Sequence, residues 1–495
     1  MKTDLKAVII GSGVAGLASA IRLSVQGVTV TVFEKNNYPG GKLSHFEKDG
    51  FHFDAGPSLF TQPQNIEELF LLAGENMADY FQYEQVPLAC KYFYEDGTII
   101  NAFTDAKKLG TELAAKLGED AGSVEEYLLQ SKKLYKNVGS IFLNYSLHKI
   151  KPLFKAPLAK AIRTVKWKHL FSSMNDVNKS FFTKPQTVQL FNRYATYNGS
   201  NPYKAPGMLC LIPHLEHNEG TFYPKGGMIS ITNALYKLAL KKGVKFQFNK
   251  PVQRIIYNEG KIKGIIANGE NIDATIAVSN MDVYGTYKYL LNDGLTAKKL
   301  LKQERSSSAL VFYWGIGKEF AQLELHNIFF SENYKAEFDH LFRSKTLYSD
   351  PTVYINITSK YGRALNAPAG KENWFVMVNA PANTGQDWDT IKKQCRKNII
   401  GKLNRLLKTD IEPLIETEET LDPIMIEDKT SSFMGSLYGT SSNSKTAAFM
   451  RHPNFSRKIK GLYFAGGSVH PGGGIPLCLL SAKIMSEIVA EDFSE

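Results

Sequence analysis

The amino-acid sequence predicts an α/β fold with two domains, one built on a parallel sheet and one on a separate, mixed sheet. Three observations predict it. A strand, a glycine-rich turn, a helix and a second strand follow one another in the first 33 residues. Alternating β-branched segments recur between residues 244 and 379, and a further strand, glycine loop and helix lie near the C-terminus. Because the two ends share one pattern, we expect the first domain to be assembled from discontinuous pieces of the chain.

The first 33 residues have the order of a βαβ unit. Residues 6–10 and 28–33 are short and β-branched, which is typical of buried strands, and residues 17–26 have the apolar spacing of a helix. Neighbouring parallel strands need such a helix as their crossover connection. This segment therefore predicts the start of the parallel sheet.

Further strands are expected along the chain. Residues 244–279 contain the turn sequences Asn258-Glu259-Gly260 and Asn268-Gly269, so they predict a β-meander. The strands expected in the second sheet are residues 309–315, 352–358 and 374–379. Residues 461–465 predict a buried strand, followed by a glycine loop and a helix from about Pro476. The two expected domains are residues 1–105, 222–285 and 440–495, and residues 106–221 and 286–439.

Composition and charge exclude several classes of protein. Hydrophobic residues at 43% and charged residues at 22% lie near the globular average, which excludes disorder, collagen and coiled coil. The net charge of +11 is local, because residues 131–175 hold ten Lys or Arg and no Asp or Glu. The rest of the chain is nearly neutral, so we expect no nucleic-acid partner.

Cysteine spacing and hydropathy indicate in which cellular compartment the protein is located. The four cysteines are far apart, so we expect reduced thiols, without a disulfide framework or a metal site. Residues 7–21 are uncharged but too short to cross a bilayer. Residues 461–482 are uncharged but rich in glycine, and they contain His470 and two prolines. We therefore expect no transmembrane helix, no export and a cytoplasmic location.

The turn of the βαβ unit is Gly11-Ser12-Gly13-Val14-Ala15-Gly16. Gly11 permits the tight turn, Gly13 lets a pyrophosphate approach the backbone, and Gly16 lets the helix pack closely on the strand. The helix N-terminus adds unpaired N–H groups and a partial positive charge. Glu34 ends the second strand, where a carboxylate can accept hydrogen bonds from ribose hydroxyls. The residues predicted to hold a dinucleotide are Gly11, Gly13, Ala15, Gly16, Glu34 and Lys35.

A paired-glycine turn, Gly40-Gly41-Lys42, follows Glu34 after a few residues. Gly41 can bring backbone N–H groups to a diphosphate, and Lys42 can neutralise it. This arrangement resembles the extended fingerprint of FAD-binding flavoproteins of the glutathione-reductase type, in the branch that holds amine oxidases and carotenoid desaturases. The resemblance implies FAD as the cofactor of a Rossmann-like domain.

The same resemblance implies contacts from three further segments. The residues that it places around the flavin and the adenine are Gly56, Pro57, Ser58, Val252, Gly467, Ser468, Gly474 and Ile475. Ser468 stands where many of these flavoproteins have an Asp that holds the ribityl chain, so that carboxylate is missing here. Val252 either packs on the adenine or is an ordinary core valine.

The resemblance extends over nearly the whole chain. Tyr223–Met228, Ala277–Asp282 and His470–Pro476 are similar to motifs of the bacterial-type carotenoid desaturases of the phytoene desaturase family. The stretch Arg193–Gly207 is similar to the 1-hydroxycarotenoid 3,4-desaturases, the hydroxyneurosporene desaturase type. It implies an FAD-dependent oxidoreductase of carotenoid biosynthesis. The implied reaction introduces a C3–C4 double bond into a 1-hydroxylated acyclic or monocyclic carotenoid by hydride transfer to the flavin, with a quinone or oxygen as electron acceptor.

A substrate with a terminal hydroxyl would need a polar anchor at the closed end of an apolar tunnel. Tyr194 and Tyr197 are candidates for this anchor, although both also suit ordinary packing. Glu216 is a candidate proton acceptor or, equally, a surface residue. The sequence assigns no catalytic residue.

The basic segment, residues 131–175, contains the pattern of an amphipathic helix. After Pro157, apolar residues recur at helical spacing and basic residues face away or flank them. The residues of this pattern are Leu158, Lys160, Ala161, Ile162, Arg163, Val165, Lys166 and Lys168. Because a carotenoid dissolves only in lipid, we expect peripheral association with the cytoplasmic membrane. The alternative is a solvated helix packed on its own domain.

Other functions fit the same fold. A phytoene desaturase, or a carotenoid isomerase or saturase, would use the same scaffold. A flavin amine oxidase fits the basic segment and the loop at His470 poorly. A prenyl-protein carrier of the GDP-dissociation-inhibitor type shares the fold without the cofactor, and the intact Gly11, Gly13 and Lys42 argue against it.

Overall fold

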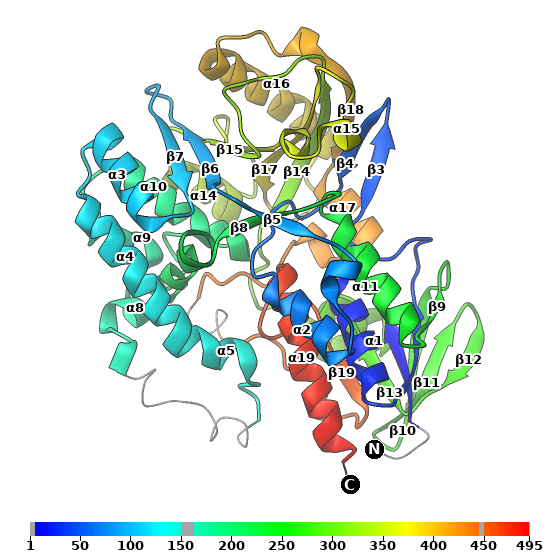
Figure 1. Ribbon diagram of the computed structural model, residues 1–495. Helices are drawn as coiled ribbons and strands as arrows, with labels where there is room; N and C mark the ends of the chain where they lie inside the picture. The colour runs from blue at the N-terminus through cyan, green and yellow to red at the C-terminus, as the bar shows by residue number, and fades with distance from the viewer. Residues whose placement is uncertain (1–4, 150–162, 445–449, 495) are drawn as a thin grey trace.

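The computed structural model describes residues 5–149, 163–444 and 450–494. Two large sheets lie at opposite ends of the molecule, one parallel and one mixed (Figure 1). A group of helices lies beside the mixed sheet, at the left of Figure 1. The predicted α/β fold with a mixed second sheet is confirmed.

The parallel sheet has five strands. In spatial order they are β19 (Leu462–Phe464), β13 (Ile276–Ser279), β1 (Lys6–Ile10), β2 (Thr29–Phe33) and β9 (Lys245–Gln247). One face packs on the helices α1 (Val14–Val25), α11 (Ile229–Lys241) and α19 (Ile475–Asp492). The other face packs on the antiparallel strands β10 (Val252–Asn258), β11 (Lys261–Ala267) and β12 (Glu270–Asp273). The predicted βαβ unit and meander are therefore confirmed.

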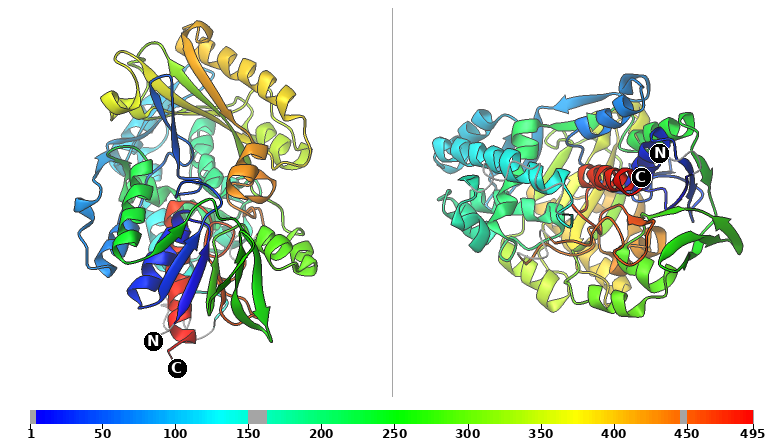
Figure 2. Two further views of the ribbon diagram at one scale, coloured as in Figure 1. Left: turned by 90° about the vertical axis from the view of Figure 1, so that its right-hand side faces the viewer. Right: turned by 90° about the horizontal axis from the view of Figure 1, so that it is seen from below.

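The strand β1 shows why this sheet has nearly continuous apolar strands. Successive side chains of a strand point to opposite faces. Ile9 packs with the helices, whereas Val8 and Ile10 pack with the meander. Because both faces are covered, every position of the strand interior favours an apolar residue. The view from below shows α19 beside the parallel sheet (Figure 2).

The second sheet has seven strands. In spatial order they are β18 (Ile415–Leu421), β14 (Ser308–Ile316), β17 (Glu372–Ala380), β16 (Val353–Asn356), β15 (His326–Phe329), β6 (Leu88–Phe93) and β7 (Ile99–Phe103). Leu310 and Phe312 of β14 pack toward α16 (Trp388–Leu407). Val311 and Tyr313 point to the opposite face, where they line a cavity. The three strands predicted for this sheet correspond to β14, β16 and β17.

The expected domain boundary at residue 105 does not match the strand pairing of the second sheet. Residues 88–103 form β6 and β7, and β6 pairs in parallel with β15 of the second sheet. The local pattern of a strand does not specify its partner, so these strands could not be assigned from their own sequence. The helices that follow share one apolar core with this edge: α3 (Ala106–Leu117), α4 (Ala121–Leu134), α9 (Met174–Lys179) and α10 (Pro185–Asn192).

The predicted amphipathic helix falls mainly on residues 157–162, which lie outside the described residues. Beside them, Arg163, Lys166 and Lys168 are exposed. Leu170 and Phe171, on helix α8 (Trp167–Phe171), expose 39% and 60% of their surface. Among the described helices, none is long and apolar enough to span a bilayer.

Gly16 lies in the first turn of α1, where the helix crosses β1. A Cβ at this position would lie 2.1 Å from the carbonyl oxygen of Gly11. We expect Gly16→Ala to push the helix off the strand and to lower the free energy of unfolding by about 1–3 kcal/mol. A decrease in the midpoint of thermal unfolding would reveal this loss.

Gly401 of α16 provides the matched control. A Cβ there meets no atom within 4 Å. Since Ala is a better helix former than Gly by about 1 kcal/mol, Gly401→Ala should raise the midpoint. A Gly16→Ala protein as stable as the unchanged chain would contradict the close packing of α1 on β1.

Candidate active site

One cavity of about 1440 Å³ is lined by residues of both large sheets. Small-molecule pockets usually measure about 300–1,000 Å³, so this cavity has room for a cofactor and a substrate together. Every residue that the sequence predicted around a dinucleotide and its flavin lines it, except Gly16. Gly16 faces the strand, in keeping with its predicted packing role.

Two glycine turns form one end of this cavity. The amide of Gly40 donates a hydrogen bond to the carbonyl oxygen of Ser12 at 2.9 Å. A Cβ on Gly41 would lie 3.3 Å from the Cα of Gly13. The two turns therefore touch through their backbones, at glycines that carry no side chain. Such a bare backbone cradle is what a diphosphate requires.

Glu34 holds the first of these turns in shape. One carboxylate oxygen accepts hydrogen bonds from the backbone N–H and the hydroxyl of Ser12, both at 2.8 Å. The other accepts from the backbone N–H of Asn36 at 3.0 Å. The carboxylate lines the cavity and is 5% exposed. It is thus fixed in place before any ribose arrives.

Lys35 and Val252 also line the cavity. The Lys35 ammonium donates to the carbonyl oxygen of Asp428 at 2.5 Å and to the hydroxyl of Ser431 at 3.0 Å, and burial lowers its pKa. Its charge is therefore directed to the 428–431 segment. Val252 opens β10 and also lines the cavity wall.

Asn280 is a site residue that the sequence analysis did not single out. With its side-chain oxygen facing α1, that oxygen accepts from the backbone N–H groups of Gly13 and Gly16, both at 3.2 Å. Its amide nitrogen then donates to the carbonyl oxygen of Ala465 at 3.2 Å. Asn280 thus ties the first turn of α1 to the strand β19 region. Its position within the Ala277–Asp282 motif was the available signal.

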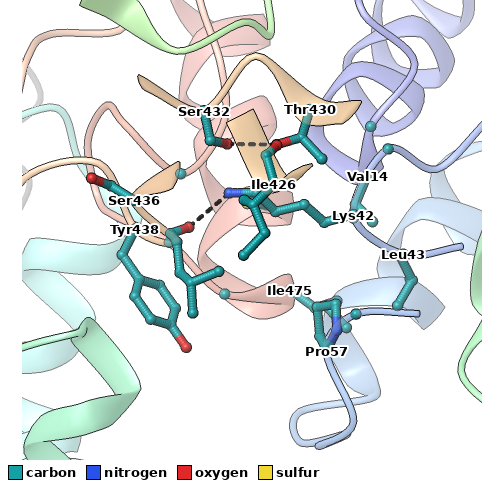
Figure 3. A pocket seen from close by; sticks show the side chains of 18 of the residues that line it. Val14, Lys42, Leu43, Pro57, Ile426, Thr430, Ser432, Ser436, Tyr438 and Ile475 are labelled. Atoms are coloured by element: carbon teal, nitrogen blue, oxygen red, sulfur yellow. Dashed lines mark hydrogen bonds between the residues drawn. The ribbon is translucent and has the colours of Figure 1, made fainter. Parts of the chain in front are cut away.

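Two cations on the wall, the half-buried Lys42 and the buried Arg451, have no ion-pair partner among the described residues. The Lys42 ammonium donates to the carbonyl oxygen of Leu437 at 2.9 Å, and burial lowers its pKa to about 8 (Figure 3). Arg451 is 2% exposed and donates to the carbonyl oxygens of Tyr438, Gly467 and Thr440. Burial lowers its pKa to about 10. No carboxylate of the described residues forms an ion pair with either side chain, so the wall suits a bound anion.

The C-terminal loop adds a helix N-terminus to the wall. The 18-residue helix α19 begins at Ile475 after Gly474, and no side chain caps it. Its first N–H groups and its partial positive charge are therefore available to a ligand beside Gly474 and Ile475. The Ser468 hydroxyl accepts from the backbone N–H of Val283 at 3.0 Å, so it supports the loop.

Beyond Gly56–Ser58, the segment predicted to border the flavin, the cavity wall is largely apolar. The apolar lining residues of this part include Phe142, Leu143, Met208, Leu209, Leu211, Ile212, Leu215, Val311, Ile328, Phe375 and Met377. They come from the helical group and from the inner face of the seven-stranded sheet. This part suits an elongated apolar ligand.

A buried polar cluster interrupts the apolar wall. One Glu216 oxygen accepts from the Arg193 guanidinium at 3.1 Å and from the Tyr194 hydroxyl at 2.6 Å. The other accepts from the Tyr197 hydroxyl. Arg193, Tyr197 and Glu216 line the cavity, whereas Tyr194 does not.

Two expectations for this cluster are therefore corrected. Tyr194 is fully buried behind the wall, where its ring packs on Arg193, so it is no direct substrate anchor. Glu216 is 1% exposed, so the surface alternative for it is wrong. Arg193 and the two tyrosines hold its carboxylate as the acceptor of three donors. Glu216 and Arg193 are 23 residues apart in the sequence, so the sequence alone could not show that they form an ion pair.

A second polar group on the apolar wall is His326, which the sequence analysis missed. Its Nδ1 lies 2.7 Å from the Tyr354 hydroxyl, and that hydroxyl lies 2.8 Å from the Ser58 hydroxyl. All three residues line the cavity. A short chain of hydrogen bonds thus leads from the Gly56–Ser58 segment to His326. No cluster of three metal-ligating side chains occurs in the part of the chain that the structure describes.

Comparison with known proteins settles the family. The family described as "Flavin containing amine oxidoreductase" matches residues 14–490. The chain belongs to this family. Its similarity to a "1-hydroxycarotenoid 3,4-desaturase" of Flavobacterium sp. (strain P99-3) is 51% identity over 98% of this chain and 99% of the relative. A "4,4'-diapolycopene oxygenase" of Methylomonas sp. is 34% identical over 98% of both chains.

Solved structures share the fold. An oxidoreductase from Methanosarcina mazei superposes with a TM-score of 0.64 at 16% identity, covering 98% of this chain and 100% of that one. A putrescine oxidase superposes with a TM-score of 0.64 at 13% identity, covering 99% of each chain. The predicted oxidoreductase, its FAD cofactor and its resemblance to the carotenoid desaturases are confirmed. The bare cradle and the two unpaired cations fit the FAD diphosphate.

Proposed function

We propose that the chain desaturates the C3–C4 bond of a 1-hydroxylated carotenoid, acyclic or monocyclic. The observation that carries this proposal is one continuous cavity that joins the diphosphate cradle to an apolar wall. The name of the 51% identical relative supplies the substrate class. The apolar wall suits a polyene, which has little to hydrogen-bond except a terminal hydroxyl.

The chain's own residues bind and orient in this mechanism. FAD, when bound, supplies the hydride acceptor for the C3–C4 bond. Lys42, Arg451 and the glycine turns would hold its diphosphate, and Glu34 its ribose. The apolar wall orients the polyene and excludes water. Desaturation also removes a proton from the substrate. Glu216 already accepts hydrogen bonds from three donors, so we do not assign it as the acceptor of that proton.

Co-expression in a pigment-forming bacterial host tests this function. Given a 1-hydroxylated carotenoid, the host should accumulate a product two hydrogens lighter and absorbing at longer wavelength; given phytoene, it should not. Conversion of phytoene alone would assign phytoene desaturation instead, and a product that gains oxygen would assign an oxygenase. A purified protein without a flavin spectrum would support the prenyl-protein carrier.

Lys42 should make FAD retention depend on pH. Its ammonium is charged below a pKa of about 8 and loses its charge above it, whereas a bound diphosphate favours the charged form. Equilibrium dialysis of the holoenzyme should therefore show constant affinity from pH 6.5 to 7.5. Above pH 8 the dissociation constant should rise by up to about tenfold per pH unit.

Lys42→Arg is the control, because a guanidinium keeps its charge throughout this range. It should flatten the pH profile, and Lys42→Met should weaken FAD binding at every pH. Identical pH profiles for the unchanged chain and Lys42→Arg would show that another group is responsible.

We further propose that the basic segment holds the protein on the cytoplasmic face of a membrane, where a quinone or oxygen could reoxidise the flavin. The exposed Leu170 and Phe171 beside exposed basic side chains support this proposal. Replacing Lys160, Arg163, Lys166 and Lys168 by Gln should release the protein from anionic liposomes in a sedimentation assay. The matched control replaces the exposed Lys318, Lys393, Lys397 and Lys408, and it should leave binding unchanged. Equal binding by both variants would refute the assignment.

A further inference from the structure

His326 is a buried polar side chain that the described residues satisfy at one ring nitrogen only. It stands at the start of β15, is 3% exposed and lines the cavity. Its Nδ1 has two neighbours, the Tyr354 hydroxyl at 2.7 Å and the Asn356 amide nitrogen at 3.2 Å. Its Nε2 has no hydrogen-bond partner among the described residues, and it is not one of the unpartnered polar atoms that lack accessible surface.

The neighbours of His326 decide which ring nitrogen carries the proton. The Asn356 amide nitrogen also donates to the carbonyl oxygen of Leu325 at 2.9 Å, and a carbonyl only accepts. The nitrogen is therefore correctly placed, and Nδ1 must accept from it. Burial, with the nearby Arg193 charge, lowers the pKa of His326 to about 3, so the ring is neutral. A neutral ring with an accepting Nδ1 carries its proton on Nε2.

The position of this N–H suits the end of the proposed substrate. Only two hydrogen bonds, through Tyr354, separate His326 from Ser58, which lies in the segment that would border the flavin. In a 1-hydroxylated carotenoid, a single methylene carbon separates C1 from C3. When the C3–C4 bond lies at the flavin, the hydroxyl on C1 must lie close to it as well. The polar anchor is therefore needed beside the flavin, not at the far end of the tunnel.

Several other polar groups of the apolar wall are already engaged, and the Tyr334 hydroxyl, which has no partner among the described residues, has almost no accessible surface. Arg193 and Tyr197 both donate to Glu216. Ser58 and Tyr354 bond to each other. His326 thus has a proton assigned to Nε2, a ring held in place through Nδ1, and no described partner for its Nε2–H.

We propose that the Nε2–H of His326 donates a hydrogen bond to the 1-hydroxyl of the carotenoid and thereby selects hydroxylated end groups. Tyr354 and Asn356 act as positioning residues that hold the ring. This assignment rests on the proposed desaturase function. A substrate without the hydroxyl would leave the buried N–H unpaired, which is how polar sites reject apolar analogues.

The test compares two carotenoids on the same enzyme preparation. One carries the 1-hydroxyl, and the other is the same carotenoid without it. The unchanged holoenzyme should prefer the hydroxylated carotenoid in kcat/KM by about 10- to 100-fold. His326→Phe should abolish this preference, mainly by raising KM for the hydroxylated carotenoid. His326→Gln, which keeps an N–H donor, should retain part of it.

The ratio of the two kcat/KM values does not depend on how much protein is folded, so a partly unstable variant remains informative. His340→Phe is the matched control, because His340 bonds to Thr346 and does not line the cavity. It should keep the full preference. A His326→Phe enzyme that keeps the full preference would overturn this assignment while the desaturase function stands. An unchanged enzyme that converts neither carotenoid would overturn the proposed function, and this assignment with it.

Discussion

Two cations, the half-buried Lys42 and the buried Arg451, lie on the wall of the cavity with no ion-pair partner among the described residues, and the proposed binding of the cofactor depends on them. Lys42 and Arg451 reach only backbone carbonyl oxygens, and no described carboxylate pairs with either. Removing a cation from water costs several kcal/mol unless an anion or strong hydrogen bonds replace the lost solvation. A bound diphosphate supplies that anion. The apoprotein therefore carries an electrostatic cost that the cofactor offsets, and cofactor binding should contribute strongly to stability.

The bare backbone of the glycine turns completes this site. Glu34 and Asn280 fix the first turn through hydrogen bonds to its backbone, so the turn needs no ligand to hold its shape. The uncapped N-terminus of α19, which lies near the C-terminus of the sequence, lines the same cavity. A diphosphate and a flavin that becomes negative on reduction both gain from such a positive helix end.

The substrate end depends on a different constraint: the two faces of β14 pack against different parts of the molecule. Leu310 and Phe312 fill the core under α16, and Val311 and Tyr313 leave an apolar wall on the other side. Polar groups are costly to bury in such a wall, and several of them are paired with one another. The Nε2 of His326 differs from these paired groups, because it has no hydrogen-bond partner among the described residues.

The sequence by itself determined much of the cofactor end, because the glycine turns act through backbone within short, continuous segments, whereas Arg451 and Asn280 were recognised only in the tertiary structure. The order strand, glycine turn, helix and acid already specifies where Gly11, Gly13 and Glu34 lie. Only the tertiary structure decided the substrate end. Arg193, Glu216 and His326 come from three separate elements, and their surroundings in the sequence are those of ordinary helices and strands. The same reason explains why the expected domain boundary at residue 105 left β6 and β7 with the first domain, although they pair with the second sheet. A strand's own residues specify its pleat and burial, whereas the packing of the whole chain decides its partner.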